Sequence, residues 1–442
     1  MDITGCQPQP LPPARVRKAR LATFIGFFQL GAMILVWSTS TTPLRNHLGW
    51  DGAQGDSDFG MLALAIGIGS AVGCFVIGPF LDRFGPRRTA TLTMVVYPLA
   101  YIPLAFLQEF GATILIGVLV GLWRGAGDTA LNAHGVQVER HYGQPIMSAF
   151  HAAYPAGGFL LGLVGSAFAR HYASSPAMSY IVLGVLMSVV GLLAGRWLLG
   201  QDELLPAPAP AQRETPAAKD TKTSEDAKAS KATTATVLLM LGFGVLLLGS
   251  MLSEGSLLDW GQEFVRRTTG ADAALAATGV SLYSGAQFVG RLFGDRLANR
   301  FGPRVVVGAS GVIGAAGALV ALSAATTYLA LTGFVLMGLG LSCMAPLMLS
   351  AAGRYDPANA GRNIGLVNAV GFCGMLVGPA AITLVVDAFG IRWMPVLSVL
   401  LLGLIALCGP LLMRTVSTTP SRGPDPDGGG AGQQEAAAEV VS

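Results

Sequence analysis

Three polar residues stand inside a long apolar run that covers residues 111–138. Arg124, Asp128 and Asn132 follow one another at intervals of four residues, so a helix stacks their side chains along one face. A charge at the centre of a membrane helix costs at least ~2.5–3.5 kcal/mol, and helices that carry one usually turn it toward a protein interior or a water-filled cavity. There, Arg124 would lower the proton affinity of Asp128, whereas desolvation would raise it. This face can therefore bind protons reversibly, although a static ion pair between packed helices would use the same residues.

The composition indicates that this run is one of many membrane-spanning helices. The chain has 442 residues, of which 52% are hydrophobic and 12% are charged, whereas soluble domains contain ~25% charged residues. Apolar runs of about 20 residues, the length that crosses a bilayer, occur twelve times. They lie near residues 21–43, 59–81, 89–107, 111–138, 148–169, 177–199, 236–258, 272–294, 304–323, 328–350, 363–386 and 392–413. We predict an all-α polytopic membrane protein with twelve transmembrane helices.

The basic residues predict the orientation of the chain. Most of the 28 Lys and Arg residues lie in the terminal segments and in alternate connections between the runs. The positive-inside rule therefore predicts that both termini are cytoplasmic. The basic residues form short clusters and no continuous basic face, so we expect no nucleic-acid partner.

Sequence motifs of enzymes and metal sites are missing. The patterns G-x-x-x-x-G-K-[ST], H-E-x-x-H and the nucleophile elbow do not occur, which argues against ATP drive and hydrolytic chemistry. The five cysteines are scattered, mostly in apolar runs, without C-x-x-C or histidine spacing, which is typical of small buried hydrophobic residues. We expect no enzymatic activity, no cofactor and no metal site.

The two hydrophobic halves of the chain repeat one another. Arg83–Arg87 recurs letter for letter as Arg300–Arg304, an offset of 217 residues, and the same offset lays Gly121 on Gly338. This identity predicts two duplicated six-helix bundles. Between them, a stretch rich in proline and charge cannot bury enough apolar surface to order itself. The expected divisions are a cytoplasmic segment (1–20), a first bundle (21–199), a flexible cytoplasmic linker (200–235), a second bundle (236–414) and a disordered cytoplasmic tail (415–442).

The repeated segment carries a family resemblance. Gly78–Arg88 is similar to the G-x-x-x-D-R-x-G-R-R signature of the major facilitator superfamily, with Pro86 preceding the final arginines. The second copy, Gly294–Arg304, has Asn299 in the place of Asp82. The resemblance extends over all twelve predicted spans. It implies two bundles related by a pseudo-two-fold axis, with a central site that opens alternately to each side of the membrane.

A second motif resembles one branch of that superfamily. Gly127–Asn132 is similar to the fourth-span motif of fucose-permease-like proton symporters, in which an acid precedes an asparagine by four residues. Residues 132–140 and 151–153, with Glu254-Gly255 and Asp259-Trp260, resemble a largely uncharacterised group of bacterial members. The resemblance implies a bacterial inner-membrane transporter with Asp128 as its proton site. We expect the protein to be a monomer.

These observations lead to one functional hypothesis with two alternatives. We expect a secondary active, proton-coupled transporter that moves a small polar solute, with sugar-like molecules as one candidate class. Efflux of amphipathic compounds and a non-transporting membrane sensor or scaffold are the alternatives. In the main hypothesis Asp128 carries the proton and Arg124 is its alternating partner. The candidate solute contacts are Asn132, Gln287, Tyr283, Gln29, Trp37, His151 and Asn368.

Some of these candidates can alternatively have a purely structural role. Asn132 can hydrogen-bond neighbouring helices, His151 and Trp37 can simply pack, and Arg291 can pair with Asp295 one turn below it. The candidate gate at the cytoplasmic side consists of Gly78, Asp82, Arg83, Gly85, Arg87, Arg88, Arg291, Asp295, Arg300 and Arg304. The arginines of this gate can alternatively serve only to fix the topology.

A candidate outer gate completes the set. Glu254 lies near the end of the apolar run at residues 236–258 and Asp259 directly follows it, so we expect both at the outer end of the seventh span. The alternative there is simple solvation at the membrane interface.

Overall fold

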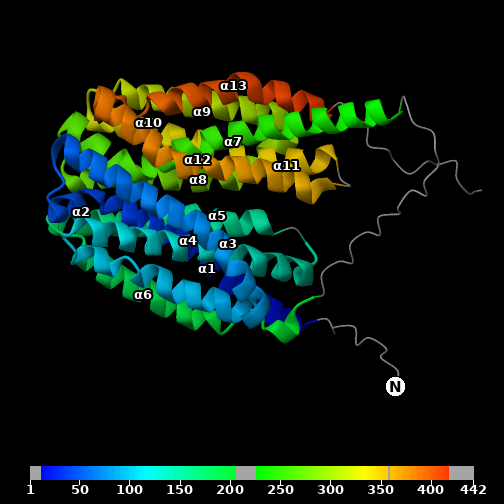
Figure 1. Ribbon diagram of the computed structural model, residues 1–442, viewed down its shortest axis with the longest axis horizontal. Helices are drawn as coiled ribbons and strands as arrows, with labels where there is room; N and C mark the ends of the chain where they lie inside the picture. The colour runs from blue at the N-terminus through cyan, green and yellow to red at the C-terminus, as the bar shows by residue number, and fades with distance from the viewer. Residues whose placement is uncertain (1–10, 145, 206–224, 357–358, 418–442) are drawn as a thin grey trace, which may run out of the picture.

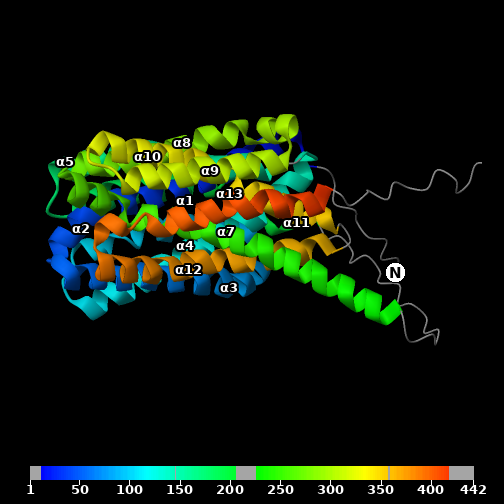
Figure 2. The same cartoon turned by 90° about the horizontal axis from the view of Figure 1, so that it is seen from above.

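The computed structural model describes residues 11–144, 146–205, 225–356 and 359–417, and these residues form helices and connections without any β-strand (Figures 1 and 2). The first half contains α1 (Pro13–Thr39), α2 (Thr41–Leu48), α3 (Gly52–Leu99), η1 (Ile102–Ala105), α4 (Phe110–Tyr142), α5 (Met147–His171), α6 (Ala177–Gly195) and η2 (Gln201–Glu203). The second half contains α7 (Glu225–Thr269), α8 (Ala273–Phe301), α9 (Pro303–Leu322), α10 (Thr327–Leu341), α11 (Met344–Tyr355), α12 (Ala360–Phe389), η4 (Ile391–Trp393) and α13 (Val396–Ser417).

The helices of the described residues account for the twelve predicted spans. Ten helical stretches are long and apolar enough to cross a membrane. One of them, α3, contains two spans, because Gly85 adopts φ 76° and breaks the helix between them. Helix α8 is long enough to be the twelfth, but polar residues such as Ser281, Tyr283 and Gln287 lower its mean hydropathy. The prediction of a twelve-span, all-α membrane protein is confirmed.

The two halves are built alike at the level of atomic contacts. A Cβ atom added to Gly121 in α4 would lie 2.0 Å from the backbone oxygen of Ile66 in α3. A Cβ atom added to Gly338 in α10 would lie 2.3 Å from the backbone oxygen of Tyr283 in α8. Ile66 and Tyr283 are themselves separated by 217 residues. The duplicated sequence therefore reproduces the same close helix packing twice, since only glycine lets two backbones approach so closely.

The break between two spans is also duplicated. Gly302, the counterpart of Gly85, has φ 83° and separates α8 from α9. Both values lie in the region that side-chain-bearing residues rarely adopt. The repeated Phe-Gly-Pro sequence thus encodes the same sharp turn in each half.

Several spans differ from the predicted bounds, among them α1, which begins at Pro13, and α8, which ends at Phe301. Helix α7 continues to Thr269 and does not end near residue 258. The tenth span is divided at Ser342 into α10 and α11, because Pro346 has no N–H to donate to the carbonyl of Ser342. That carbonyl instead accepts a hydrogen bond from Nε of Arg291, 3.4 Å away.

The predicted linker is shorter in the structure than the sequence suggested. Residues 201–205 pack on the first half, where Gln137 accepts from the backbone N–H of Leu205 at 3.1 Å and His141 hydrogen-bonds the carbonyl of Glu203 at 2.8 Å. Helix α7 begins at Glu225, inside the expected linker. Residues 206–224, the chain before residue 11 and the tail beyond residue 417 lie outside the described residues.

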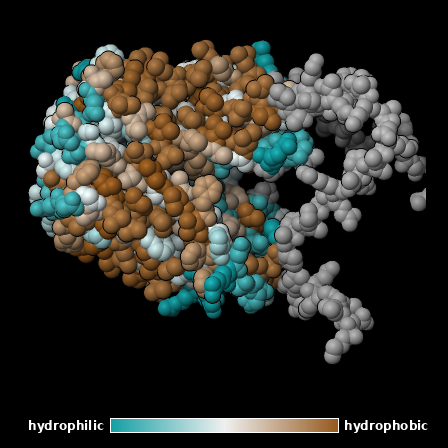
Figure 3. All heavy atoms as spheres, viewed as in Figure 1, coloured by the Kyte–Doolittle hydropathy of each residue, from teal (hydrophilic) through white to brown (hydrophobic). Residues whose placement is uncertain are grey.

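The surface has the character of a membrane protein. Apolar side chains cover the flank of the helices and hydrophilic side chains gather at their ends (Figure 3). Large hydrophobic residues on this flank are strongly exposed, including Phe75 (84%), Leu407 (73%) and Leu384 (70%). A lipid bilayer would bury this apolar surface.

Helices α3 and α12, one from each half, approach each other at the end that carries α2. A Cβ atom added to Gly60 in α3 would lie 2.0 Å from Oγ1 of Thr383 in α12, and one added to Gly67 would lie 3.4 Å from the backbone oxygen of Met375. One added to Gly78, farther along α3, would meet nothing within 4 Å. Helices α3 and α12 therefore diverge toward the end where the chain begins.

Candidate functional site

The polar face of α4 lies in the interior of the helix assembly. Gly121 and Gly125 press α4 against α3, and Arg124 and Asp128 are partly exposed. Arg124 interacts electrostatically with Tyr97, Tyr101, Tyr154 and Asp259. The charge of Arg124 is therefore within electrostatic range of hydroxyl groups of its own half and of a carboxyl group of the second half.

The expected ion pair between Arg124 and Asp128 is not formed in this conformation. The two charges interact electrostatically, but no salt bridge joins them among the described residues. Asp128 also interacts electrostatically with Cys74 of α3. The two side chains share one face of α4, as predicted, and both interact electrostatically with Cys74 of α3 and Tyr154 of α5.

Three tyrosines near Arg124 were not identified from the sequence. The hydroxyl groups of Tyr97 and Tyr101 are 3.0 Å apart, and both side chains are buried. Tyr154 of α5 interacts electrostatically with both Arg124 and Glu254. The i, i+4 spacing of Tyr97 and Tyr101 inside an apolar run is a signal that could have indicated them, whereas Tyr154 has no such signal.

Asn132 and His151 form a polar bridge between α4 and α5. Nδ2 of Asn132 donates to the backbone oxygen of Asp128 at 2.9 Å, and its Oδ1 lies 3.1 Å from Nε2 of His151. Because an amide oxygen only accepts, Nε2 of His151 donates this hydrogen bond. The His151 ring packs on Phe27 at 4.8 Å. Both predicted residues are therefore brought together, and each makes a structural contact.

Arg291 connects this bridge to the second half. Its Nη1 donates to the backbone oxygen of His151 at 2.8 Å. The sequence suggested a salt bridge between Arg291 and Asp295, but within the described part of the chain Arg291 has only carbonyl partners, and Asp295 is exposed. Carbonyl groups replace the carboxylate because Ser342, at the break between α10 and α11, presents a free backbone oxygen.

The predicted outer position of Glu254 and Asp259 is wrong. Helix α7 continues to Thr269, so both acids lie inside the assembly. Oδ1 of Asp259 accepts a hydrogen bond from Nε1 of Trp37 at 3.0 Å, and Glu254 interacts electrostatically with Tyr283. The sequence placed the end of the span too early because these two acids and the polar residues after them interrupt the apolar run.

The remaining solute candidates have different surroundings. Tyr283 and Gln287 are buried on α8, where Nε2 of Gln287 donates to the Tyr283 hydroxyl at 3.2 Å. Gln29 is buried and donates to the backbone oxygen of Met94 in α3. This contact places Gln29 between α1 and α3, two helices of the first half. Asn368 is partly exposed on α12.

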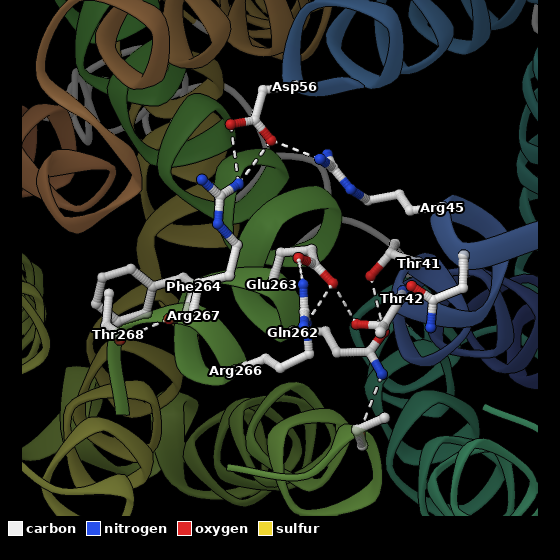
Figure 4. Close-up of polar contacts among 12 residues, drawn as sticks. Thr41, Thr42, Arg45, Asp56, Gln262, Glu263, Phe264, Arg266, Arg267 and Thr268 are labelled. Carbon is white, nitrogen blue, oxygen red and sulfur yellow. Dashed lines mark hydrogen bonds and ion pairs between the residues drawn. The ribbon is translucent and has the colours of Figure 1, made fainter. Parts of the chain in front are cut away.

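A cluster of polar residues joins the halves at the end that carries α2 (Figure 4). Asp56 of α3, 3% exposed, accepts hydrogen bonds from Arg45 of α2 at 2.5 Å and from Arg267 of α7 at 2.6 and 2.8 Å. We call these residues, together with Thr41, Thr42, Gln262, Glu263 and Arg266, the latch.

The rest of the latch joins the halves through two threonines of α2, which bond Gln262 and Glu263 of α7. Oε1 of Gln262 accepts from the Thr41 hydroxyl at 2.8 Å and from the Thr42 N–H at 3.0 Å. The Thr42 hydroxyl donates to Glu263, whose carboxylate also pairs with Arg266 at 2.9 Å. The latch was not identified from the sequence, although opposite charges in connections predicted for the same side of the membrane were a usable signal.

The predicted gate motif lies at the opposite end and is largely exposed. Asp82, Arg83, Arg87 and Arg88 are exposed at the turn made by Gly85. The Arg83 guanidinium lies over the Phe84 ring at 5.5 Å, and in the second copy Arg300 lies over Phe301 at 5.3 Å. Arg304 is partly exposed at the start of α9. No hydrogen bond or ion pair of the described chain joins these residues to the other half.

Comparison with known proteins agrees with this architecture. The family model of the Major Facilitator Superfamily matches residues 22–265 and 261–439. The uncharacterized transporter y4wD of Sinorhizobium fredii (strain NBRC 101917 / NGR234) is 27% identical over 390 residues, which cover 88% of this chain and 96% of the relative. The membrane sensor protein UhpC of Escherichia coli (strain K12) is 24% identical over 358 residues, covering 77% and 80%.

A solved structure has the same fold. The crystal structure of the D-xylose-proton symporter superposes with a TM-score of 0.68 at 15% sequence identity, covering 89% of this chain and 97% of the other. The family match, the twelve spans and the duplicated helix packing lead to the same conclusion. The chain belongs to the major facilitator superfamily and is a multi-pass secondary transporter of a poorly characterised bacterial group.

Proposed function

We propose that this protein couples the movement of a small polar solute to the movement of protons, with Asp128 as the proton carrier. The observation that carries the proposal is the position of Arg124 and Asp128. They share one face of α4, they are partly exposed in the interior, and neither is neutralised by a salt bridge with a described residue. An acid that is both accessible and desolvated can change its protonation during transport.

Arg124 is the group that changes partner in this scheme. Its neighbours Tyr97, Tyr101 and Tyr154 offer hydroxyl oxygens, and Asp259 offers a carboxylate from the second half. When the halves move, the Arg124 charge is drawn either toward Asp259 or toward Asp128. Approach to Asp128 favours its ionised form and proton release, whereas withdrawal favours proton uptake.

The latch supports a defined conformation for this state. Direct bonds from Asp56 to Arg267 and from Thr41 to Gln262 close the assembly at the α2 end, and α3 and α12 diverge at the other end. With the amino terminus in the cytoplasm, as the positive-inside rule favours, this is an inward-open conformation. The exposed Asp82 motif would contact the second half only when the cytoplasmic side closes.

The proposed solute contacts are the polar groups that lie between the helices. The Asn132 amide and the His151 ring bond each other, as do Gln287 and Tyr283. A solute with several hydroxyl groups can replace such bonds without leaving a buried polar group unpaired. This makes a small polyhydroxy compound the leading solute class.

The deciding experiment uses purified protein in liposomes that contain a pH-sensitive dye. Sugars, polyols, nucleosides, amino acids and cationic drugs are added singly to wild type and to Asp128→Asn. We expect one polar class to trigger proton flux in wild type, and the variant to exchange that solute while failing to accumulate it. Accumulation against a gradient by Asp128→Asn would refute the role of Asp128. Proton flux triggered by cationic drugs alone would favour efflux of amphipathic compounds.

A sensor is the second candidate, because the relative in Escherichia coli is named a membrane sensor protein. A sensor binds its ligand without net movement. Saturable solute binding by the wild-type protein, combined with no flux in the liposomes, would favour it over transport.

A further inference from the structure

A basic pocket lies where the first half begins and ends. It has a volume of about 340 Å³ and is formed by the start of α1, the turn region of α3, the end of α6 and η2. We call it the basic pocket. Its lining residues are Arg15, Lys18, Arg87, Arg196, Trp197, Asp202 and Glu203.

Arg15 and Glu203 of the pocket pair with each other. Nε and Nη2 of Arg15 donate to the two carboxylate oxygens of Glu203 at 2.6 and 2.5 Å. Arg15 also donates to the backbone oxygens of Trp197 at 2.6 Å and Leu198 at 2.8 Å. Arg15 and Glu203 thus neutralise each other and hold η2 against α1 and α6.

The other basic residues of the pocket form no ion pair with a described residue. Lys18 and Arg196 are exposed and have no hydrogen bond or ion pair with a described residue. Arg87 uses only Nε, which donates to the backbone oxygen of Gly195 at 3.3 Å. Against these three cations the pocket offers a single further acid, Asp202. Its uncompensated charge is therefore positive.

An exposed apolar stripe leads away from the pocket along α6. Met178, Val182, Val185, Leu186, Val189, Leu192 and Leu193 are exposed at helical spacing, and Trp197 follows them at the pocket rim with 39% exposure. An indole at the boundary between apolar surface and charge is typical of the membrane interface. The pocket thus offers a site for an anionic group directly above a surface for hydrocarbon chains.

We propose that the basic pocket binds the phosphate headgroup of an anionic phospholipid, with its acyl chains on the α6 stripe. Arginine and lysine donate charge-assisted hydrogen bonds to phosphate oxygens, and basic pockets between membrane helices are suited to lipid headgroups. A free phosphate ester would use the same cations, but it would make no contact with the adjoining apolar stripe. The inference does not depend on the solute or on proton coupling.

The test counts lipids bound to the detergent-purified full chain by native mass spectrometry. Phosphatidylglycerol, phosphatidylcholine and glycerol 1-phosphate are titrated separately into wild type, into Lys18→Gln/Arg196→Gln and into a matched control, Arg17→Gln/Arg296→Gln. The control removes two exposed bases that do not line the pocket. The melting midpoint of each variant with and without phosphatidylglycerol provides a second readout.

We expect wild type and control to retain one tightly bound phosphatidylglycerol and to be stabilised by it. Each base near a membrane surface changes the binding of an anionic lipid by about five-fold, so the pocket variant should bind it about 30-fold more weakly. Equal loss in the control would show that only total charge matters and would overturn the proposal. Equal binding of phosphatidylcholine, or of glycerol 1-phosphate without acyl chains, would overturn the assignment to an anionic lipid.

Discussion

The two halves of this transporter share a scaffold but not a chemistry. Gly121 packs against the backbone of Ile66, and Gly338 packs in the same way against the backbone of Tyr283, which is 217 residues after Ile66. Gly85 and Gly302 make the same turn. Yet the positions in the second half that correspond to Arg124 and Asp128 are Leu341 and Ala345.

This difference shows that helix packing constrains both halves, whereas the polar residues of the interior are free to differ between them. Close packing of helices must be satisfied in both halves, so the duplicated glycines persist. A charge in the membrane interior is costly wherever it lies, so the second half carries none at the corresponding positions. It contributes different polar groups, Glu254 and Asp259 of α7, from another helix. We infer that coupling resides in the asymmetry between the halves.

The largest expected effect comes from the latch, which has no symmetry-related copy because Ala273 stands at the position that corresponds to Asp56. Asp56→Asn leaves the buried Arg45 without its carboxylate, and such a loss costs about 3–5 kcal/mol. Because Arg45 and Asp56 belong to the same half, only the simultaneous loss of the bond from Arg267 weakens this conformation relative to one that opens at the α2 end. Spin labels at residues 53 and 271 should report longer distances in the variant.

Asp58→Asn is the control for the latch, since the carboxylate of Asp58 bonds Gln54 of the same helix. Unchanged label distances in Asp56→Asn would show that the latch does not hold the halves together.

The second effect tests the shared scaffold. Gly121→Ala and Gly338→Ala each push a methyl group into a backbone oxygen, and overpacking of this kind costs about 1–3 kcal/mol. We expect similar losses of melting temperature in detergent for the two variants. Gly403→Ala, where a Cβ atom meets nothing within 4 Å, should be neutral or slightly stabilising. A loss at only one of the two matched glycines would contradict equal packing in the halves.

A smaller effect is expected from the polar contacts that differ between the halves. Asn132 bonds His151, whereas Asn368 is the residue that corresponds to His151 in the second half. Because one neutral hydrogen bond contributes about 0.5–1.5 kcal/mol, Asn132→Ala should weaken solute binding by about 2- to 10-fold. Asn368→Ala should change it less, since no described residue hydrogen-bonds Asn368 in this conformation. Half-saturation of solute exchange measures both, and a larger loss for Asn368→Ala would place the solute nearer the second half.

The smallest effect concerns the Arg15–Glu203 pair of the first half. Partial burial raises the pKa of Glu203, but the hydrogen bonds from Arg15 and from the Gly200 N–H outweigh burial and hold this pKa below its ordinary value of 4.5. The pair therefore stabilises the fold fully above pH 4.5 and loses this contribution as the pH falls through the lowered value. At pH 7, Glu203→Gln should have a lower melting temperature than wild type. At pH 4 this difference in melting temperature should be smaller. An identical difference at both pH values would contradict this origin.

The sequence by itself determined the frame of this protein. Twelve apolar runs, the repeated Arg-Phe-Gly-Pro-Arg segment and the spacing of Arg124, Asp128 and Asn132 follow from chain periodicity, because a helix fixes which residues share a face. These signals are local or repeated, so they can be read without knowledge of the packing.

Only the tertiary structure decided which groups meet across the halves. Asp259 lies near Arg124, Asp56 binds Arg267, and Arg291 binds the His151 carbonyl, although each pair is distant in sequence. The sequence placed Glu254 and Asp259 at a helix end because polar residues interrupt an apolar run equally at a membrane surface and at an interior polar site. Packing of the second half against the first distinguishes these cases, since it supplies the partners that make buried charge tolerable.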